Sequence, residues 1–183
     1  MNLPNMITMG RVIAIPFFMY FLYTENFLVA VILFTVASIS DFVDGYLARK
    51  MNLVTNFGKF MDPTADKLLV YSALIIFAER GLMSSIFVTI IVARDFIINT
   101  MRSIAVEKGT VIPAMWSGKV KTTVQMVGII LIMILAHLQA SLDISYSMSL
   151  MPIIKAVSGI IAGVTIYSGI DYIIRMKSIF KDN

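Results

Sequence analysis

Residues 41–67 read DFVDGYLARKMNLVTNFGKFMDPTADK, and this segment lies between two long apolar runs of the chain. It holds four of the chain's 11 acidic residues, Asp41, Asp44, Asp62 and Asp66. A carboxylate close to a membrane is costly in free energy unless a partner neutralises its charge. The spacing and the surroundings of these four aspartates therefore decide which fold and which chemistry the chain supports.

The composition of the whole chain is that of a membrane protein. Of its 183 residues, 58% are hydrophobic and only 14% are charged, and the mean hydropathy is +0.87. A soluble domain of this size would expose large apolar patches at such a composition. The chain contains no cysteine, which excludes a disulfide framework and thiol chemistry. Its length predicts a single domain over residues 1–183.

Six apolar runs predict an all-α bundle of six transmembrane helices, since about 20 apolar residues cross the hydrocarbon core of a bilayer. The runs cover residues 9–24, 27–49, 61–79, 83–106, 119–139 and 150–174. Short connections predict antiparallel neighbours, and we expect no interior proline in the third and fourth helices. The residues before the first run predict a short juxtamembrane segment. That run lacks a small-residue cleavage site, so we expect a retained helix and not a signal peptide.

Basic residues divide unequally between the two ends of the predicted bundle. The connections after the second and fourth runs, with their flanking helix ends, and the C-terminal tail hold Arg49, Lys50, Lys59, Arg102, Lys108, Lys119, Lys121, Arg175, Lys177 and Lys181. The opposite end holds Arg80 and Lys155. By the positive-inside rule, both termini and both basic connections face the cytoplasm. The four aspartates lie at the same face, where we expect a polar cavity.

The four aspartates form two pairs, and each pair shares one helical face. Asp41 and Asp44 are three residues apart, and Asp62 and Asp66 are four apart. The hairpin between the pairs brings them to one depth, where four unneutralised carboxylates would repel one another. Hard divalent cations, Mg²⁺ or Mn²⁺, suit a site made only of carboxylates. Two such ions would suit phosphoryl transfer.

Small and polar residues beside the aspartates predict a ligand that contains phosphate. Gly45 and Ala48 leave a groove beside Asp44, Arg49 offers a guanidinium fork to phosphate, and Thr55 offers a hydroxyl. Solvation or pairing with a neighbouring lysine would explain one aspartate at a helix end. It does not explain four at these spacings.

The same residues carry a resemblance to a known family. The string Asp41-x2-Asp44-Gly45-x2-Ala48-Arg49-x8-Gly58-x3-Asp62-x3-Asp66 resembles, without departure, the signature of the CDP-alcohol phosphotransferases. This resemblance implies a six-helix membrane fold with a cytoplasm-facing cavity, a binuclear metal site and often a homodimer. It also implies transfer of a phosphatidyl group from a CDP-linked lipid to an alcohol, with release of CMP.

Three further stretches are similar to the members of that family that use glycerol 3-phosphate as the acceptor. They are LPNMITMGR (3–11), ARDFIINTMR (93–102) and SGKVKTTVQ (117–125), whereas the chain beyond residue 130 gives only generic apolar helix. The resemblance implies a bacterial cytoplasmic-membrane enzyme that converts CDP-diacylglycerol and glycerol 3-phosphate to phosphatidylglycerol phosphate and CMP. A sister enzyme for another alcohol, inositol phosphate or phosphatidylglycerol, is the alternative.

The resemblance also implies roles for single residues. The four aspartates are expected to bind two metal ions, Mg²⁺ or Mn²⁺. Asp66 is in addition expected to be the general base that takes the proton of the acceptor hydroxyl. The residues expected to hold CDP-diacylglycerol are Asn5, Thr8, Gly45, Ala48, Arg49 and Thr55.

Several basic residues predict a pocket for the phosphate of the acceptor. Arg94 and Arg102 are eight residues apart, about two helical turns, so they lie on broadly one face. Arg94 belongs to an apolar run, where an unpaired guanidinium is expensive unless it faces a polar cavity. The predicted pocket consists of Arg11, Arg94, Arg102, Lys119 and Lys121. Alternatively, the lysines and Arg11 only follow the positive-inside rule, and Arg94 pairs with Asp95.

A small ion transporter is the alternative from another functional class, because it also needs carboxylates inside a helical bundle. It predicts acids near the bilayer midplane and broken helices, whereas these acids cluster at one end. We expect His137 and Trp116 to be interfacial residues and Asp171 to pair with a nearby Arg or Lys. The expected partners are the two substrates, the lipid bilayer and a second copy of the chain, and not a nucleic acid.

Overall fold

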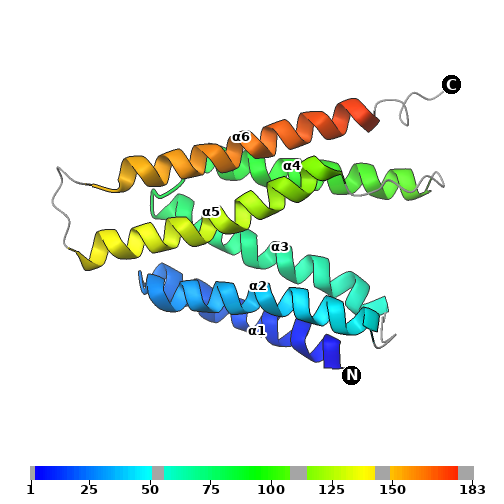
Figure 1. The fold of residues 1–183 in the computed structure, drawn as a ribbon, viewed down its shortest axis with the longest axis horizontal. Helices are drawn as coiled ribbons and strands as arrows, with labels where there is room; N and C mark the ends of the chain where they lie inside the picture. Colours follow the sequence, from blue (N-terminus) through cyan, green and yellow to red (C-terminus); the bar gives the residue numbers. More distant parts are fainter. Residues whose placement is uncertain (1–2, 51–55, 108–114, 143–148, 177–183) are drawn as a thin grey trace.

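The computed structural model of the chain describes residues 3–50, 56–107, 115–142 and 149–176. These residues form six α-helices and no β-strand (Figure 1). In chain order the helices are α1 (Leu3–Tyr23), α2 (Phe27–Lys50), α3 (Asn56–Glu79), α4 (Ser85–Glu107), α5 (Trp116–Ser141) and α6 (Met151–Met176). The predicted all-α membrane fold, with one helix at each of the six apolar runs, is confirmed.

The helices differ in how apolar they are. Among the described residues, three segments are long and apolar enough to cross a membrane, namely Met6–Tyr23 in α1 and the whole of α5 and α6. A shorter apolar segment, Phe27–Ser40, forms the first part of α2. Helices α3 and α4 carry charged residues well inside their length, and these residues build the polar cavity described below.

Helices α1 and α3 begin five or more residues earlier than the hydropathy pattern predicts. The predicted juxtamembrane segment is the first part of α1, and α3 begins at Asn56 rather than at residue 61. Pro63 therefore lies inside α3, and the prediction that this helix has no interior proline was wrong. The reason is that hydropathy marks only the part of a helix that contacts hydrocarbon. Backbone hydrogen bonds continue the helix into the polar interface.

The helices pack as an antiparallel bundle in which α3 lies between two groups (Figure 1). Helix α1 contacts α2 and α3, α6 contacts α4 and α5, and α2 contacts α5. The start of α1 and the end of α6 lie at the same end of the bundle, which we call the site end. The end of α2, the start of α3 and the end of α4 also lie there. This topology therefore gathers most of the predicted site residues at one end.

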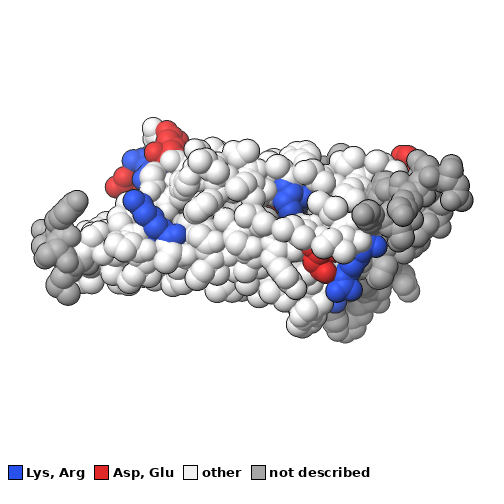
Figure 2. Space-filling model, turned by 90° about the horizontal axis from the view of Figure 1, so that it is seen from above, with Lys and Arg blue, Asp and Glu red and all other residues white. Residues whose placement is uncertain are grey.

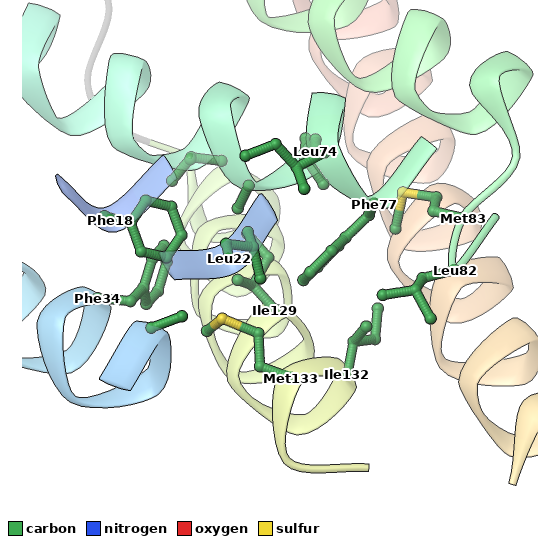
Figure 3. Close-up of a cluster of buried hydrophobic side chains, with 14 of the residues drawn as sticks. Phe18, Leu22, Phe34, Leu74, Phe77, Leu82, Met83, Ile129, Ile132 and Met133 are labelled. Atoms are coloured by element: carbon green, nitrogen blue, oxygen red, sulfur yellow. The ribbon is translucent and has the colours of Figure 1, made fainter. Parts of the chain in front are cut away.

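The main hydrophobic core fills the half of the bundle away from the site end. Phe18 and Leu22 of α1, Phe34 of α2, Phe77 of α3 and Ile132 of α5 are all fully buried there (Figure 3). Burial of one such side chain stabilises a fold by about 1.5–3 kcal/mol. A second, smaller cluster lies towards the site end and consists of Ile98, Ala105, Tyr172 and Met176. Most of the buried apolar side chains therefore lie in the half of the bundle away from the site end.

Arg80 ties α3 to the α1–α2 turn at the end opposite the site. Its Nη1 lies 2.8 Å from Glu25 Oε1, its Nη2 donates to the Tyr23 carbonyl, and its guanidinium carbon lies 4.6 Å from the Tyr23 ring centroid. On the face drawn in Figure 2, charged side chains gather at the two ends, and the middle is uncharged except for one small basic patch. An apolar middle between charged ends is typical of a bundle that spans a bilayer.

Candidate active site

The second aspartate pair lies on α3, near the site end. Asp62 and Asp66 are separated by one helical turn, and both are half-buried. The hydroxyl of Thr8, on α1, donates to Asp62 Oδ1 at 2.7 Å, and Thr8 itself is 1% exposed. A buried hydroxyl that donates to one carboxylate oxygen fixes the orientation of the carboxylate. Thr8, for which the family resemblance implies a contact with the donor nucleotide, thus contacts a predicted metal ligand.

Several predicted site residues lie outside the described side chains. Asp41, Asp44, Gly45, Ala48 and Arg49 belong to the last turns of α2, and only their helical backbone is described. The side chain of Asn5 and the whole of Thr55 also lie outside the described part. Within that part, no group of three or more His, Cys, Asp or Glu residues converges. The predicted four-aspartate metal site therefore stays a prediction.

The described carboxylates fit a hard divalent cation. Asp62 and Asp66 present only oxygen atoms, they lie one turn apart on one helix, and the Thr8 hydroxyl orients one of them. Mg²⁺ and Mn²⁺ favour carboxylate ligands that are held in this way by an outer shell of hydrogen bonds. The donor set is thus of the kind that the prediction requires.

A cavity of about 470 Å³ opens among α3, α4, α5 and α6. Asp66 lines this cavity together with four of the five basic residues predicted to bind the acceptor phosphate, which are Arg94, Arg102, Lys119 and Lys121. The fifth, Arg11, is buried on α1 one turn after Thr8 and is not among the described residues that line the cavity. Because basic residues outnumber acidic ones on its walls, the cavity attracts anions.

Asp95 organises the basic wall of the cavity, which is formed by Arg94, Arg102, Lys119 and Lys121. Its carboxylate lies 2.7 Å from Lys121 Nζ and 3.1 Å from Arg94 Nη1. The Lys121 side chain is only 4% exposed, so it needs this partner to remain charged without a large cost. The Tyr71 hydroxyl donates to the same carboxylate at 3.4 Å. Arg94 was predicted either to belong to the phosphate pocket or to pair with Asp95. The two interpretations are compatible, because it pairs with Asp95 and also lines the cavity.

Helix α6 positions both arginines of α4. Arg94 Nη2 donates to Ser168 Oγ at 2.6 Å, and Arg102 Nε donates to the hydroxyl of the buried Tyr172 at 2.5 Å. The guanidinium carbons lie 6.0 Å and 5.2 Å from the Tyr172 ring centroid. A Cβ on Gly169 would come within 3.1 Å of Arg94 Cγ, so the absent side chain leaves room for the arginine.

These α6 residues were missed by the sequence analysis, which found only generic apolar helix beyond residue 130. The available signal was a small and polar group, Ser168, Gly169 and Tyr172, inside an otherwise apolar helix. Asp171, next to it, accepts hydrogen bonds from Ser117 Oγ and Arg175 Nε, each at 2.6 Å. The expectation that Asp171 pairs with a nearby basic residue is thus met.

The two other residues set aside by the sequence analysis do not line the cavity. His137 has its ring nitrogens 3.4 Å from Ser141 Oγ near the end of α5. Trp116, at the start of α5, is 77% exposed. Neither residue contacts the aspartates or the basic wall among the described residues, so both remain outside the candidate site.

The bundle combines apolar helices with a carboxylate pair and an anion-attracting cavity at the site end, an arrangement typical of a membrane-embedded enzyme that acts on a charged substrate. The family model for CDP-alcohol phosphatidyltransferase matches residues 1–166. The chain belongs to this family, as the aspartate signature predicted, and it is an enzyme. Members of the family generally depend on divalent cations.

Curated relatives support the assignment. A Bacillus subtilis protein is 43% identical over 143 residues, which are 70% of this chain and 74% of the relative. A Rickettsia felis protein is 41% identical over 128 residues, 68% of this chain and 71% of the relative. An Escherichia coli protein is 41% identical over 137 residues, 70% of this chain and 74% of the relative. All three are named CDP-diacylglycerol--glycerol-3-phosphate 3-phosphatidyltransferase.

Proposed function

We propose that this protein transfers the phosphatidyl group of CDP-diacylglycerol to glycerol 3-phosphate, forming phosphatidylglycerol phosphate and CMP. The observation that carries the proposal is the cavity in which Asp66 lies with Arg94, Arg102, Lys119 and Lys121. The names of the relatives, which state this activity, agree with the chemistry of the cavity.

The basic wall suits the acceptor. Glycerol 3-phosphate is a dianion at neutral pH, so its phosphate needs several cations in a site partly removed from water. Arg94 and Lys121 are held by Asp95, and Arg102 is held by Tyr172, so these donors need little rearrangement to bind an anion. The cavity walls fix the phosphate, and this leaves the acceptor's primary hydroxyl to be directed towards Asp66.

The reaction that we propose is a single in-line displacement. Asp66 takes the proton of the primary hydroxyl while the hydroxyl oxygen forms a bond to the phosphorus that carries diacylglycerol. The bond from that phosphorus to the bridging oxygen of the pyrophosphate breaks, and CMP leaves with the bonding electrons. The residues proposed to hold the donor are Asn5, Thr8, Gly45, Ala48, Arg49 and Thr55.

Two divalent cations, Mg²⁺ or Mn²⁺, would be held by Asp41, Asp44, Asp62 and Asp66 and would supply positive charge beside the pyrophosphate. The hydrogen bond from Thr8 to Asp62 supports this assignment, because metal-binding carboxylates are commonly oriented by such outer contacts. We further propose that the chain lies in the bacterial cytoplasmic membrane with both termini and the cavity facing the cytoplasm, and that it forms a homodimer. The uneven distribution of basic residues supports this orientation.

The proposal is tested with purified protein in detergent micelles that contain CDP-diacylglycerol and Mg²⁺. Each assay adds one alcohol, either glycerol 3-phosphate, inositol phosphate or phosphatidylglycerol, and measures the release of CMP. We expect rapid release with glycerol 3-phosphate and only background release with the other two or with no acceptor. Release that requires a different alcohol would assign the protein to a sister activity of the family. Absence of release with every acceptor would refute the proposed transfer.

A further inference from the structure

Gln125 is a polar residue on the cavity wall that has no role in the reaction proposed above. It lies on α5, one helical turn beyond Lys121 and therefore further from the site end. The residue is 3% exposed, yet it lines the same cavity as Asp66 and the four basic residues. Gln125 is thus buried in the protein and borders the space where a substrate would bind.

The amide of Gln125 has no hydrogen-bond partner among the residues that the structure describes. Its Nε2 is fully enclosed and unpaired, and no hydrogen bond to its oxygen is found. The great majority of buried polar side-chain atoms in proteins have a partner, so such an exception needs an explanation.

Buried donors without a partner among the described residues also occur outside the cavity, at Ser38 Oγ and Arg80 Nε, so the position of Gln125 on the cavity wall carries the argument. Gln139, on the same helix but at the opposite end of the bundle, accepts a hydrogen bond from the Leu150 amide at 2.6 Å. Arg94, on the wall of the cavity, also has a buried donor, Nε, without a partner among the described residues. Two residues of the cavity wall thus hold an unpaired donor, which favours a polar ligand in the cavity as the missing partner.

The chemistry of the amide restricts which ligand group it fits. A phosphate is matched by the arginines and lysines, which offer charge. An uncharged amide that both donates and accepts is matched by a hydroxyl, which also does both. Glycerol 3-phosphate has two hydroxyls, and the primary one is the group directed at Asp66. The secondary hydroxyl is therefore the group left without a partner.

We propose that Gln125 binds the secondary hydroxyl of the acceptor. It thereby selects alcohols with a second hydroxyl on the carbon adjacent to the one that bears the reacting hydroxyl. This inference rests on the proposed transfer to glycerol 3-phosphate and extends it from the charge of the acceptor to its hydroxyl pattern. An acceptor without the secondary hydroxyl leaves the buried amide unpaired, and sites built to bind a hydroxyl discriminate strongly against such analogues.

The test compares Gln125→Met with the unsubstituted protein on two acceptors, glycerol 3-phosphate and 3-hydroxypropyl phosphate, which lacks only the secondary hydroxyl. Methionine has a similar length and shape but cannot form the hydrogen bond. We expect kcat/KM for glycerol 3-phosphate to fall about 10–100-fold. The value for 3-hydroxypropyl phosphate should stay within about 3-fold of that of the unsubstituted protein, and the KM for CDP-diacylglycerol should not change.

The unfolding temperature in detergent distinguishes a ligand-binding role of Gln125 from a purely structural one. Replacing an unpaired buried amide by an apolar side chain of similar volume removes an unsatisfied group, so Gln125→Met should unfold at a higher temperature than the unsubstituted protein. Gln139→Met is the matched control, because it removes a paired amide from the same helix. It should unfold at a lower temperature and leave the ratio of kcat/KM values for the two acceptors unchanged.

The possible outcomes separate this inference from the proposed function. Equal losses with both acceptors, or no loss with either, would overturn the role of Gln125 and leave the proposed transfer intact. If the unsubstituted protein releases no CMP with glycerol 3-phosphate, the transfer itself fails and the inference fails with it. If neither Gln125→Met nor Gln125→Leu folds, Gln125 is a structural residue and the inference is again overturned.

Discussion

At the scale of single residues, the orientation of Asp62 depends on a hydroxyl from a helix that begins more than 50 residues earlier in the chain. This contact supports a role for Thr8 in orienting a predicted metal ligand, and its contact with the donor nucleotide stays a prediction. Thr8→Val removes the hydroxyl and keeps the shape of the side chain. We expect it to weaken Mn²⁺ binding about 10–100-fold, the usual effect of losing an outer-shell contact. Electron paramagnetic resonance of Mn²⁺ measures this affinity directly.

Thr8→Ser is the matched control for that experiment, because it keeps the donating hydroxyl and should bind Mn²⁺ much as the unsubstituted protein does. If Thr8→Val instead binds Mn²⁺ normally and loses affinity for CDP-diacylglycerol without metal, the residue contacts the nucleotide, as the family resemblance implied.

Asp66 is the described aspartate that faces the acceptor side of the site, since it lines the cavity with the basic residues. If it is the general base, Asp66→Asn should lower kcat about 10²–10⁴-fold. The variant should still bind CDP-diacylglycerol, because three carboxylates remain for the cations. Steady-state kinetics combined with a donor-binding measurement separates the two effects. Parallel losses of donor affinity and turnover would assign Asp66 mainly to metal binding.

At the scale of elements, α6 determines where the arginines of α4 lie. Gly169→Ala adds a Cβ about 3.1 Å from Arg94 Cγ, and Arg94 cannot move freely because Asp95 and Ser168 hold its guanidinium. We expect the KM for glycerol 3-phosphate to rise about 2–10-fold, the effect of weakening one hydrogen bond. The KM for CDP-diacylglycerol should stay unchanged, and CMP release at varied acceptor concentration gives both values.

Gly163→Ala is the control for this substitution, because a Cβ at Gly163 meets no atom within 4 Å on the same helix. The two variants add the same methyl group to α6. If they change the acceptor KM equally, the effect comes from helix α6 as a whole and not from Arg94.

The elements themselves were well predicted from the sequence, and their contacts were not. Hydropathy located all six helices because each helix needs an apolar surface of its own. The spacing of Arg94 and Arg102 predicted a shared face because both residues lie on one helix. By contrast, the contact of Arg94 with Ser168 and that of Thr8 with Asp62 join distant segments. No local period encodes such contacts, and the unpaired amide of Gln125 is visible only once the surrounding helices are in position.

At the scale of the whole molecule, the site joins helices from both halves of the chain, and divalent cations are proposed to neutralise its carboxylates. Removing them with EDTA should abolish CMP release, and added Mg²⁺ or Mn²⁺ should restore it. The cations should also raise the unfolding temperature, because a ligand that binds only the native state stabilises it. Asp62→Asn should lose most of both effects. Full activity after chelation would contradict the proposed metal site.

The uneven core has a consequence for how the lipid donor enters. Large apolar side chains join the helices in the half away from the site. Near the site end, the Lys121–Asp95 ion pair, hydrogen bonds from α4 to α6 and a four-residue cluster join α4, α5 and α6. Segments with few buried apolar contacts open locally at a lower free-energy cost than the rest of a fold. Backbone amides near the site end should therefore exchange with deuterium faster than those around Phe77. The same local opening would let a lipid with two acyl chains enter between the helices directly from the bilayer, while the opposite half keeps the helices packed together.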